Sequence, residues 1–266
     1  MELKLDTDKM IARIEDGIGW MIFNQPEKRN AMSLAMRQAV PTILEEFQRN
    51  DDVRVVVMTG AGDKAFVSGA DISEFNEQRA TPEQIAAYNA QGEKSQAAYA
   101  NLKKPLIAMI RGFCVGGGLA TALKADLRFS ADDSQFGIPA GRLGLGYGYD
   151  AVRGIMDFVG PAYAAEILFT ARMFKALDAQ RMGLINGYHP ADKLEDFVRE
   201  TAKAIASNAP LTVKLAKTAI NEHRKNPADR DLVLCQQQLD ACMGSADYIE
   251  GRTAFMEKRK PQFKGR

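Results

Sequence analysis

The sequence predicts an α/β fold whose last part is entirely helical. Segments that resemble buried parallel strands occur at residues 53–58, 106–110 and 127–130. Helical periodicity dominates from Ala151 onward, and its last three segments have no strand signal between them. We therefore expect a β/α body over residues 1–200, which carries the functional site, and a helical region over residues 201–266.

The N-terminal elements follow from alternating and helical patterns. Residues 10–14 and 19–23 are predicted strands, and the Asp16-Gly17 pair between them is a hairpin signal. After a loop, Ser33 is a suitable N-cap for a helix. The apolar residues of that helix fall on one face: Met36, Val40, Ile43, Leu44 and Phe47. Pro41 lies within this pattern and predicts a kink.

Further helices are predicted between the buried strands and after them. The stretch 78–104 is polar, rich in Ala and Gln, and helical in propensity. A short helix at 119–124 follows three consecutive glycines, and residues 134–148 form a Gly-rich loop region. The remaining predicted helices span residues 151–159, 211–222, 232–243 and 246–258.

The bulk composition is that of an ordinary globular protein. The chain has 266 residues, of which 46% are hydrophobic and 26% charged. A formal net charge of +1 gives no global field that favours nucleic acid or an anionic membrane. The three cysteines lack C-x-x-C spacing, which disfavours a disulfide framework or a metal site and fits a reducing cytoplasm. No stretch predicts a signal peptide or a membrane span.

Two glycine-rich loops, residues 67–72 and 114–119, each follow a strand-like run and precede a helix-like stretch. Glycine lets the backbone approach a ligand closely and adopt positive φ, and the start of a helix offers free N–H groups. Two such loops on neighbouring strands can direct two N–H groups at one oxygen, as in an oxyanion hole. On spacing alone, tight turns that bind nothing explain the pattern equally well. The P-loop and Rossmann patterns are not matched.

Short motifs, in order along nearly the whole chain, resemble those of the crotonase (enoyl-CoA hydratase/isomerase) superfamily. In the first half they are QPEKRNA at 25–31, SGADI at 68–72, KPLIA at 104–108 and GGG at 116–118. In the second half they are ADLR at 125–128, FGIP at 136–139, GLIN at 183–186 and FMEKRKPQF at 255–263. Each motif is moderately specific, and together, at these spacings, they identify the chain as a member of the superfamily.

The resemblance implies a spiral of β-β-α turns followed by helices that build a homotrimer, commonly paired into a hexamer. It implies a coenzyme A thioester as substrate, no permanently bound cofactor, and no metal. It places two oxyanion N–H donors on Ala70 and Gly117. The positions that the resemblance assigns to the CoA or substrate site are Lys28, Arg29, Ala31, Ser68, Asp71, Ile72, Pro139 and Lys258. Lys258 is expected to reach the CoA phosphates from a neighbouring subunit; a solvated tail is the alternative.

The chain departs from the family at its two usual acid–base glutamates. One is expected two residues after the Gly-Gly-Gly run, and the other directly after the Pro of Phe-Gly-x-Pro. Those positions hold Ala120 and Ala140. Hydration of an enoyl double bond needs groups that activate water and protonate the α-carbon, and methyl groups do neither. Two-glutamate hydration is therefore disfavoured, although an enolate-stabilising lyase or isomerase remains in keeping with the motifs.

The loop around Tyr147 suggests an alternative reaction. Here the sequence resembles the methylmalonyl-CoA decarboxylase branch, which has a tyrosine at the position of Tyr147 but a histidine where this chain has Ala70. Decarboxylation needs enolate stabilisation and no general base, so Tyr147 and Asp150 are candidate catalytic residues. Tyr147 could instead only pack, and Asp150 could only cap a helix. The third hypothesis, beside a lyase or isomerase and a decarboxylase, is a protein that binds acyl-CoA without catalysing a reaction.

Overall fold

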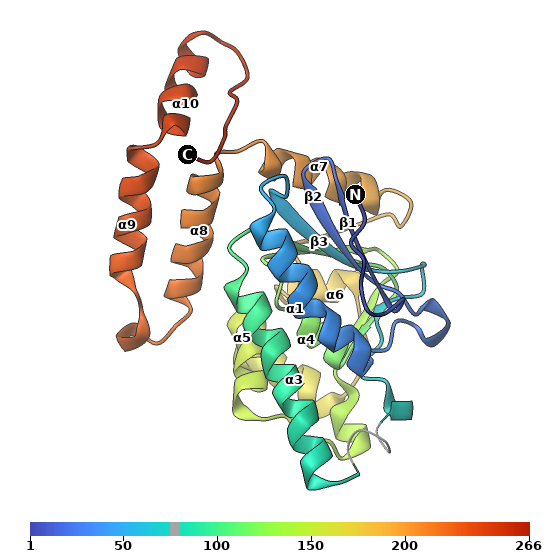
Figure 1. The fold of residues 1–266 in the computed structure, drawn as a ribbon. Coiled ribbons are helices and arrows are strands. Elements are labelled where there is room, and N and C mark those ends of the chain that lie inside the picture. The colour runs from blue at the N-terminus through green and yellow to red at the C-terminus, as the bar shows by residue number, and fades with distance from the viewer. Residues whose placement is uncertain (75–79) are drawn as a thin grey trace.

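The computed structural model describes residues 1–74 and 80–266 and confirms the α/β class (Figure 1). A six-stranded sheet has the order β1-β2-β3-β5-β7-β10, and a four-stranded sheet has the order β4-β6-β8-β9. The first sheet comprises β1 (Met10–Glu15), β2 (Ile18–Phe23), β3 (Val55–Gly60), β5 (Leu106–Ile110), β7 (Leu127–Ala131) and β10 (Gly187–His189). The second comprises β4 (Ala65–Val67), β6 (Phe113–Val115), β8 (Gln135–Gly137) and β9 (Phe174–Lys175).

The body is built from successive turns of a spiral. In each turn the chain adds one parallel strand to the six-stranded sheet and the next strand to the four-stranded sheet, before it enters a helix. The pairs are β3 with β4, β5 with β6, and β7 with β8. They lead to α3 (Pro82–Asn101), α4 (Gly117–Ala122) and α5 (Tyr149–Thr170). This is the spiral of β-β-α turns that the resemblance implies.

Strand alternation divides the core into two layers on the faces of the six-stranded sheet. Val55 and Val57 face one layer, while Val56 and Met58 face the other, as expected from the period of two in a strand. The first layer is covered by α7 (Leu194–Ala206). The second lies between the two sheets, α1 (Leu34–Arg49) and α6 (Ala176–Arg181). Burial on both faces thus explains why β3 and β5 consist almost entirely of apolar residues.

The helix predicted after Ser33 begins as expected, because the Ser33 hydroxyl accepts a hydrogen bond from the Met36 N–H. The helix continues through Pro41 to Arg49 without interruption, so the proline does not end it. The helix predicted at 78–104 corresponds to α3. Residues 78 and 79 of the prediction lie outside the described residues. The helix predicted at 151–159 corresponds to the first part of α5, which changes direction at Gly160, where φ is +71°.

The last three helices form a C-terminal arm, which comprises α8 (Pro210–His223), α9 (Leu232–Met243), α10 (Ala246–Met256) and the segment up to Arg266. The arm projects from one side of the body, with α8 and α9 side by side (Figure 1). α7 crosses residue 200 and packs on the sheet. The division into domains at that residue stays a prediction.

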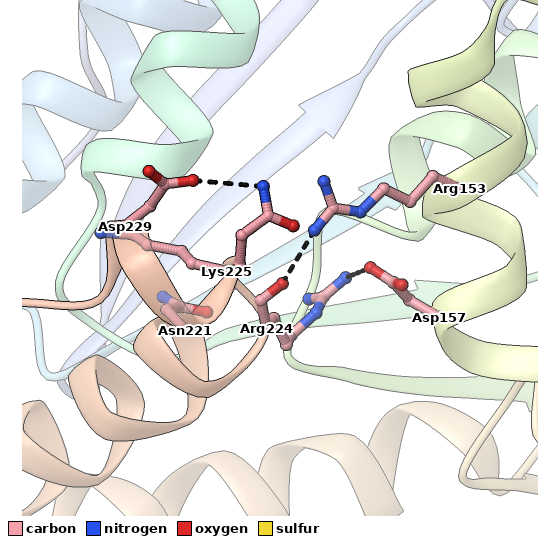
Figure 2. A pocket seen from close by; sticks show the side chains of 7 residues that line it. Arg153, Asp157, Asn221, Arg224, Lys225 and Asp229 are labelled. Atoms are coloured by element: carbon pink, nitrogen blue, oxygen red, sulfur yellow. Dashed lines mark hydrogen bonds and ion pairs between the residues drawn. The ribbon is translucent and has the colours of Figure 1, made fainter.

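Polar contacts join the arm to α5, as Figure 2 shows. The guanidinium of Arg153 donates to the carbonyl oxygen of Arg224 at 3.2 Å, and Arg224 forms a 3.4 Å salt bridge with Asp157. These exposed pairs contribute little stability individually, so the arm is held by few interactions there. Among the described helices, none is long and apolar enough to cross a membrane.

Candidate functional site

The two glycine-rich loops lie side by side because their strands are neighbours. β4 and β6 pair in parallel, with Val67 opposite Cys114. Parallel strands end at the same edge of a sheet, so the chain leaves both strands in the same place. Gly69 follows β4 with φ of +126°, and Gly116 follows β6 with φ of +54°. Both are conformations that residues with a Cβ rarely adopt.

Gly118 lets the two loops approach each other. A Cβ built on this residue would lie 1.9 Å from the carbonyl oxygen of Val67, far inside van der Waals contact. A Cβ on the neighbouring Gly117 would lie 3.7 Å from the backbone nitrogen of Ala70. The structure therefore brings together Ala70 and Gly117, the two residues to which the resemblance assigns the N–H donors.

The N–H groups of Ala70 and Gly117 are available to a ligand. Their neighbours are engaged, because the Gly116 N–H donates to the Gly137 carbonyl and the Asp71 N–H to the Met32 carbonyl, at 2.8 and 3.0 Å. Within residues 1–74 and 80–266, neither the Ala70 N–H nor the Gly117 N–H has a hydrogen-bond acceptor. Two unoccupied donors at one point can bind one oxygen that carries negative charge.

Lys28 and Asp71 meet beside these loops. The Lys28 ammonium donates to Asp71 Oδ2 at 3.0 Å and to the Ser73 hydroxyl at 3.1 Å. Burial raises the pKa of the Asp71 carboxyl, but hydrogen bonds from Ser73 and Lys28 outweigh that effect and leave the pKa below its usual value. The hydrogen bond to Asp71 raises the pKa of Lys28, so both groups are ionised near neutral pH. With 45% of its side chain exposed, Lys28 can also meet an anion from solvent.

The other predicted binding residues differ in exposure, and one of them lies in the arm, away from the rest. The Arg29 carbonyl accepts from the Ser68 N–H at 3.2 Å, and the Arg29 guanidinium lies 5.1 Å from the centre of the Phe113 ring. Ala31 is half-buried, and Ile72 is 64% exposed. Lys258 follows α10, and α10 lies in the arm, well away from the turn at residues 72–74 (Figure 1). A single chain therefore does not bring Lys258 to the other predicted residues.

The two alanines at the positions where the resemblance implies glutamates differ in exposure. Ala120 is exposed on α4, whereas Ala140 is buried in the 3-10 helix Pro139–Leu143, whose first residue is half-buried. Neither side chain can transfer a proton. Within the described part of the chain, no group of three or more His, Cys, Asp or Glu side chains is arranged to hold a metal ion.

Tyr147 and Asp150 occupy different environments. Tyr147 is half-buried against the main core, and burial raises the pKa of its phenol, so the phenol is neutral at pH 7. Asp150 is exposed in the first turn of α5, where the N-cap residue is Gly148, so Asp150 is not the cap. Tyr149 is 81% exposed.

Asn30 positions the loop that carries Lys28, and the sequence analysis gave it no role. Its side chain is fully buried; it accepts from the Gln25 N–H and donates to the Ala61 and Ala65 carbonyls, all within 2.9 Å. The loop is thereby fixed to the start of β4. Asn30 also has φ of +53°, a conformation that asparagine tolerates better than most residues. Its place in the QPEKRNA motif was the one available signal.

The chain is similar to known proteins over nearly its whole length. A family model described as enoyl-CoA hydratase/isomerase matches residues 13–266. The short-chain-enoyl-CoA hydratase of Clostridium acetobutylicum is 33% identical over 98% of this chain and 100% of its own length. The crotonyl-CoA hydratase of Syntrophomonas wolfei is 33% identical over 96% of this chain and 98% of its own.

The fold comparison points the same way. A crystal structure of an enoyl-CoA hydratase/carnithine racemase from Magnetospirillum magneticum has a TM-score of 0.91 and 34% identity, and the match covers 98% of this chain and 97% of that chain. Fold and sequence thus define an enzyme of acyl-CoA chemistry. The chain belongs to the enoyl-CoA hydratase/isomerase family, which confirms the resemblance to the crotonase superfamily.

Replacing Gly118 by Ala is expected to separate the two loops, because the added methyl group would overlap the Val67 carbonyl. We expect a loss of about 1–3 kcal/mol in the free energy of unfolding, typical of overpacking, measured by urea denaturation. The matched control is Gly154→Ala in α5, where a Cβ meets no atom within 4 Å. The control should be neutral or slightly stabilising, and equal losses in both variants would contradict the close-approach argument.

Proposed function

We propose that this protein is a lyase or isomerase that acts on an acyl-CoA and stabilises a thioester enolate with the N–H groups of Ala70 and Gly117. The observation that carries the proposal is the 3.7 Å spacing between a Cβ position on Gly117 and the Ala70 nitrogen, with both N–H groups unoccupied. Membership of a family that processes acyl-CoA supports a thioester as the substrate.

In the proposed reaction, the thioester carbonyl oxygen accepts hydrogen bonds from both N–H groups. As the α-carbon becomes nucleophilic, negative charge moves to this oxygen and both bonds strengthen. A single donor of this kind is worth about 3–4 kcal/mol of transition-state stabilisation. The Lys28 ammonium and Arg29 guanidinium are proposed to bind CoA phosphates, while Ala31, Ser68, Asp71, Ile72 and Pro139 line the path to the carbonyl.

We propose a reaction other than two-glutamate hydration, although the relatives named above are hydratases. Ala120 and Ala140 supply no carboxylate, so water cannot be activated at either position. Enolate stabilisation needs neither side chain, and it serves an isomerisation or a lyase reaction whose proton transfers use other groups. Asp150 is a candidate for such a role, because its exposed carboxylate lies near Tyr147 in sequence.

A second candidate is decarboxylation of a methylmalonyl-CoA-type substrate, and the half-buried neutral phenol of Tyr147 favours it. The bond between the α-carbon and the carboxylate breaks, CO2 leaves, and the electron pair remains in the enolate. Tyr147 then gives its proton to the α-carbon and recovers one from water. The lack of carboxylates at positions 120 and 140 removes like-charge repulsion against the anionic substrate.

A homotrimer, or a hexamer made from two trimers, is proposed as the working assembly, located in the cytoplasm. The arm exposes large apolar side chains: Leu232, Val233, Ile249, Phe255 and Met256, each at least 65% exposed. Exposed apolar surface of this kind marks an interaction site. A neighbouring subunit would also supply Lys258 to the CoA phosphates. Sedimentation equilibrium is expected to give three or six times the mass of 29.2 kDa, and a monomer at micromolar concentration would contradict the assembly.

The donor role of Gly117 is tested by Gly117→Pro. Proline lacks an N–H but is tolerated at the first position of a helix, where Gly117 lies. With a panel of enoyl-CoA and malonyl-type substrates, we expect a fall of about 10²- to 10³-fold in kcat. Gly117→Ala adds a Cβ but keeps the N–H, and so separates a steric effect from loss of the donor. Binding of acyl-CoA by calorimetry without turnover of any substrate would support a silent binding protein instead.

The role of Tyr147 is tested by Tyr147→Phe, which keeps the ring and removes the proton. If the phenol protonates the α-carbon, decarboxylation should fall about 10²-fold or more, while binding of CoA is unchanged. Tyr149→Phe is the control, because the neighbouring phenol is largely exposed and its loss should alter neither quantity. Unaltered turnover in Tyr147→Phe would show that this side chain only packs.

A further inference from the structure

A cavity lies at the amino ends of two strands of the six-stranded sheet, β3 and β5. It has a volume of about 360 Å³, and Arg54 and Pro105, which line it, directly precede β3 and β5. The loop of the candidate site that carries Lys28 lies beyond the carboxyl end of β3, where the Asn30 side chain donates to the Ala61 carbonyl oxygen. At about 3.3 Å per residue, the six residues of β3 separate the two ends by about 20 Å. The cavity is therefore distinct from the acyl-CoA site.

This cavity concentrates positive charge from both the body and the arm. Five of its lining side chains are cationic and form neither a hydrogen bond nor a salt bridge with the described residues: Arg54, Lys103, Lys214, Lys264 and Arg266. Asp51 is the one acidic side chain among the lining residues that the structure describes. Such an excess of like charge raises the energy of the empty cavity, and an anion that entered it would lower that energy.

Lys104 is a sixth cation in the wall of the cavity. Its ammonium group already forms hydrogen bonds, but these do not reduce the positive charge of the cavity. Its ammonium donates to the carbonyl oxygens of Phe47 and Asn50, both at 2.7 Å. These partners are neutral, so they leave its positive charge uncompensated. Burial, opposed by the nearby Asp51 and assisted by Arg54, lowers the pKa of Lys104 to about 8. Near neutral pH this ammonium still adds to the positive potential of the cavity.

The wall that the arm contributes is held in place. The buried carboxylate of Asp247 accepts from the N–H groups of Lys264 and Gly265, both at 2.7 Å. Gly265 has φ of +78°, and a Cβ there would lie 3.4 Å from Pro210 and 3.5 Å from Arg54 Nη1. The last residues of the arm are thus fixed against the start of α8 (Figure 1), and they position Lys264 over the cavity.

Between the cations, the walls of the cavity are apolar. Val53, Pro105, Pro210 and Leu211 contribute to the lining, as do Ile205 and Val213. A cavity of this type fits a ligand that combines a doubly charged anion with a carbon body. Phosphate accepts hydrogen bonds from several Arg and Lys side chains at once, and charge-assisted bonds of this kind are among the strongest in proteins.

We propose that this cavity binds a small organic phosphate at a site separate from the acyl-CoA site. The phosphate bridges Arg54 and Lys103 of the body with Lys214 and Lys264 of the arm, and the carbon body contacts the apolar walls. Because the cations come from both parts, the bound ligand stabilises the arm on the body. The site is formed by one chain and does not depend on the reaction proposed for the oxyanion donors.

Isothermal titration calorimetry and thermal unfolding test this site with phenyl phosphate, inorganic phosphate and phenol as probes. Phenyl phosphate is expected to bind once per chain, more tightly than inorganic phosphate, and to raise the midpoint of unfolding; phenol is expected not to bind. Arg54→Gln/Lys214→Gln should weaken binding of phenyl phosphate at least tenfold. Lys4→Gln/Lys175→Gln, which removes the same charge from exposed positions elsewhere, should bind as the unaltered protein does.

Three outcomes would overturn the proposal. One is a rise in the midpoint that sodium chloride reproduces at equal ionic strength, since that is screening and not binding. Another is equal weakening in both double variants, because the effect would then follow net charge. The third is persistence of phenyl phosphate binding in Arg54→Gln/Lys214→Gln together with its loss in Lys28→Gln, because the phosphate would then occupy the CoA site.

Discussion

The contact between Gly118 and Val67 is the constraint on which the candidate site depends. A backbone carbonyl of one loop occupies the space in which any other residue at position 118 would carry its Cβ. The parallel pairing of β4 with β6 brings the loops to one edge, and the lack of a side chain lets them close to contact distance. The Ala70 and Gly117 N–H groups are therefore fixed by the folding of the backbone. No side-chain rotamer has to be selected to form the site, so its geometry is preorganised.

This backbone site stands apart from the acid–base groups of the family. Side chains at positions 120 and 140 can change without altering the two N–H donors, because neither residue takes part in the close approach. The same pair of backbone donors can thus serve reactions that differ in where protons are added or removed. In this chain both positions hold alanine, and the half-buried phenol of Tyr147 is the proton donor that we propose.

The sequence predicted the parts of the fold that have a strong periodic or continuous signal. The runs at 53–58, 106–110 and 127–130 correspond to β3, β5 and β7, each buried on both faces. The three-residue strands β4, β6 and β8 were not predicted, because three residues are too few to show a period of two. The glycine-rich loops indicated where an oxyanion hole could form, and only the resemblance assigned it to Ala70 and Gly117. The basic cavity could not be found at all, because Arg54, Lys103, Lys214 and Lys264 are far apart in the chain and each one alone looks like an ordinary exposed cation.

The shortness of the strands that carry the site has a consequence for the order of folding. Each of β4, β6 and β8 pairs with a partner from a different turn of the spiral, so every pairing closes a long loop for only a few hydrogen bonds. The six-stranded sheet instead begins with the local hairpin β1–β2 and offers longer strands with larger apolar side chains. Non-local pairings of low individual stability form late and open first. Of the two sheets, the one that holds the Ala70 and Gly117 loops is therefore expected to open first, while the larger sheet remains intact.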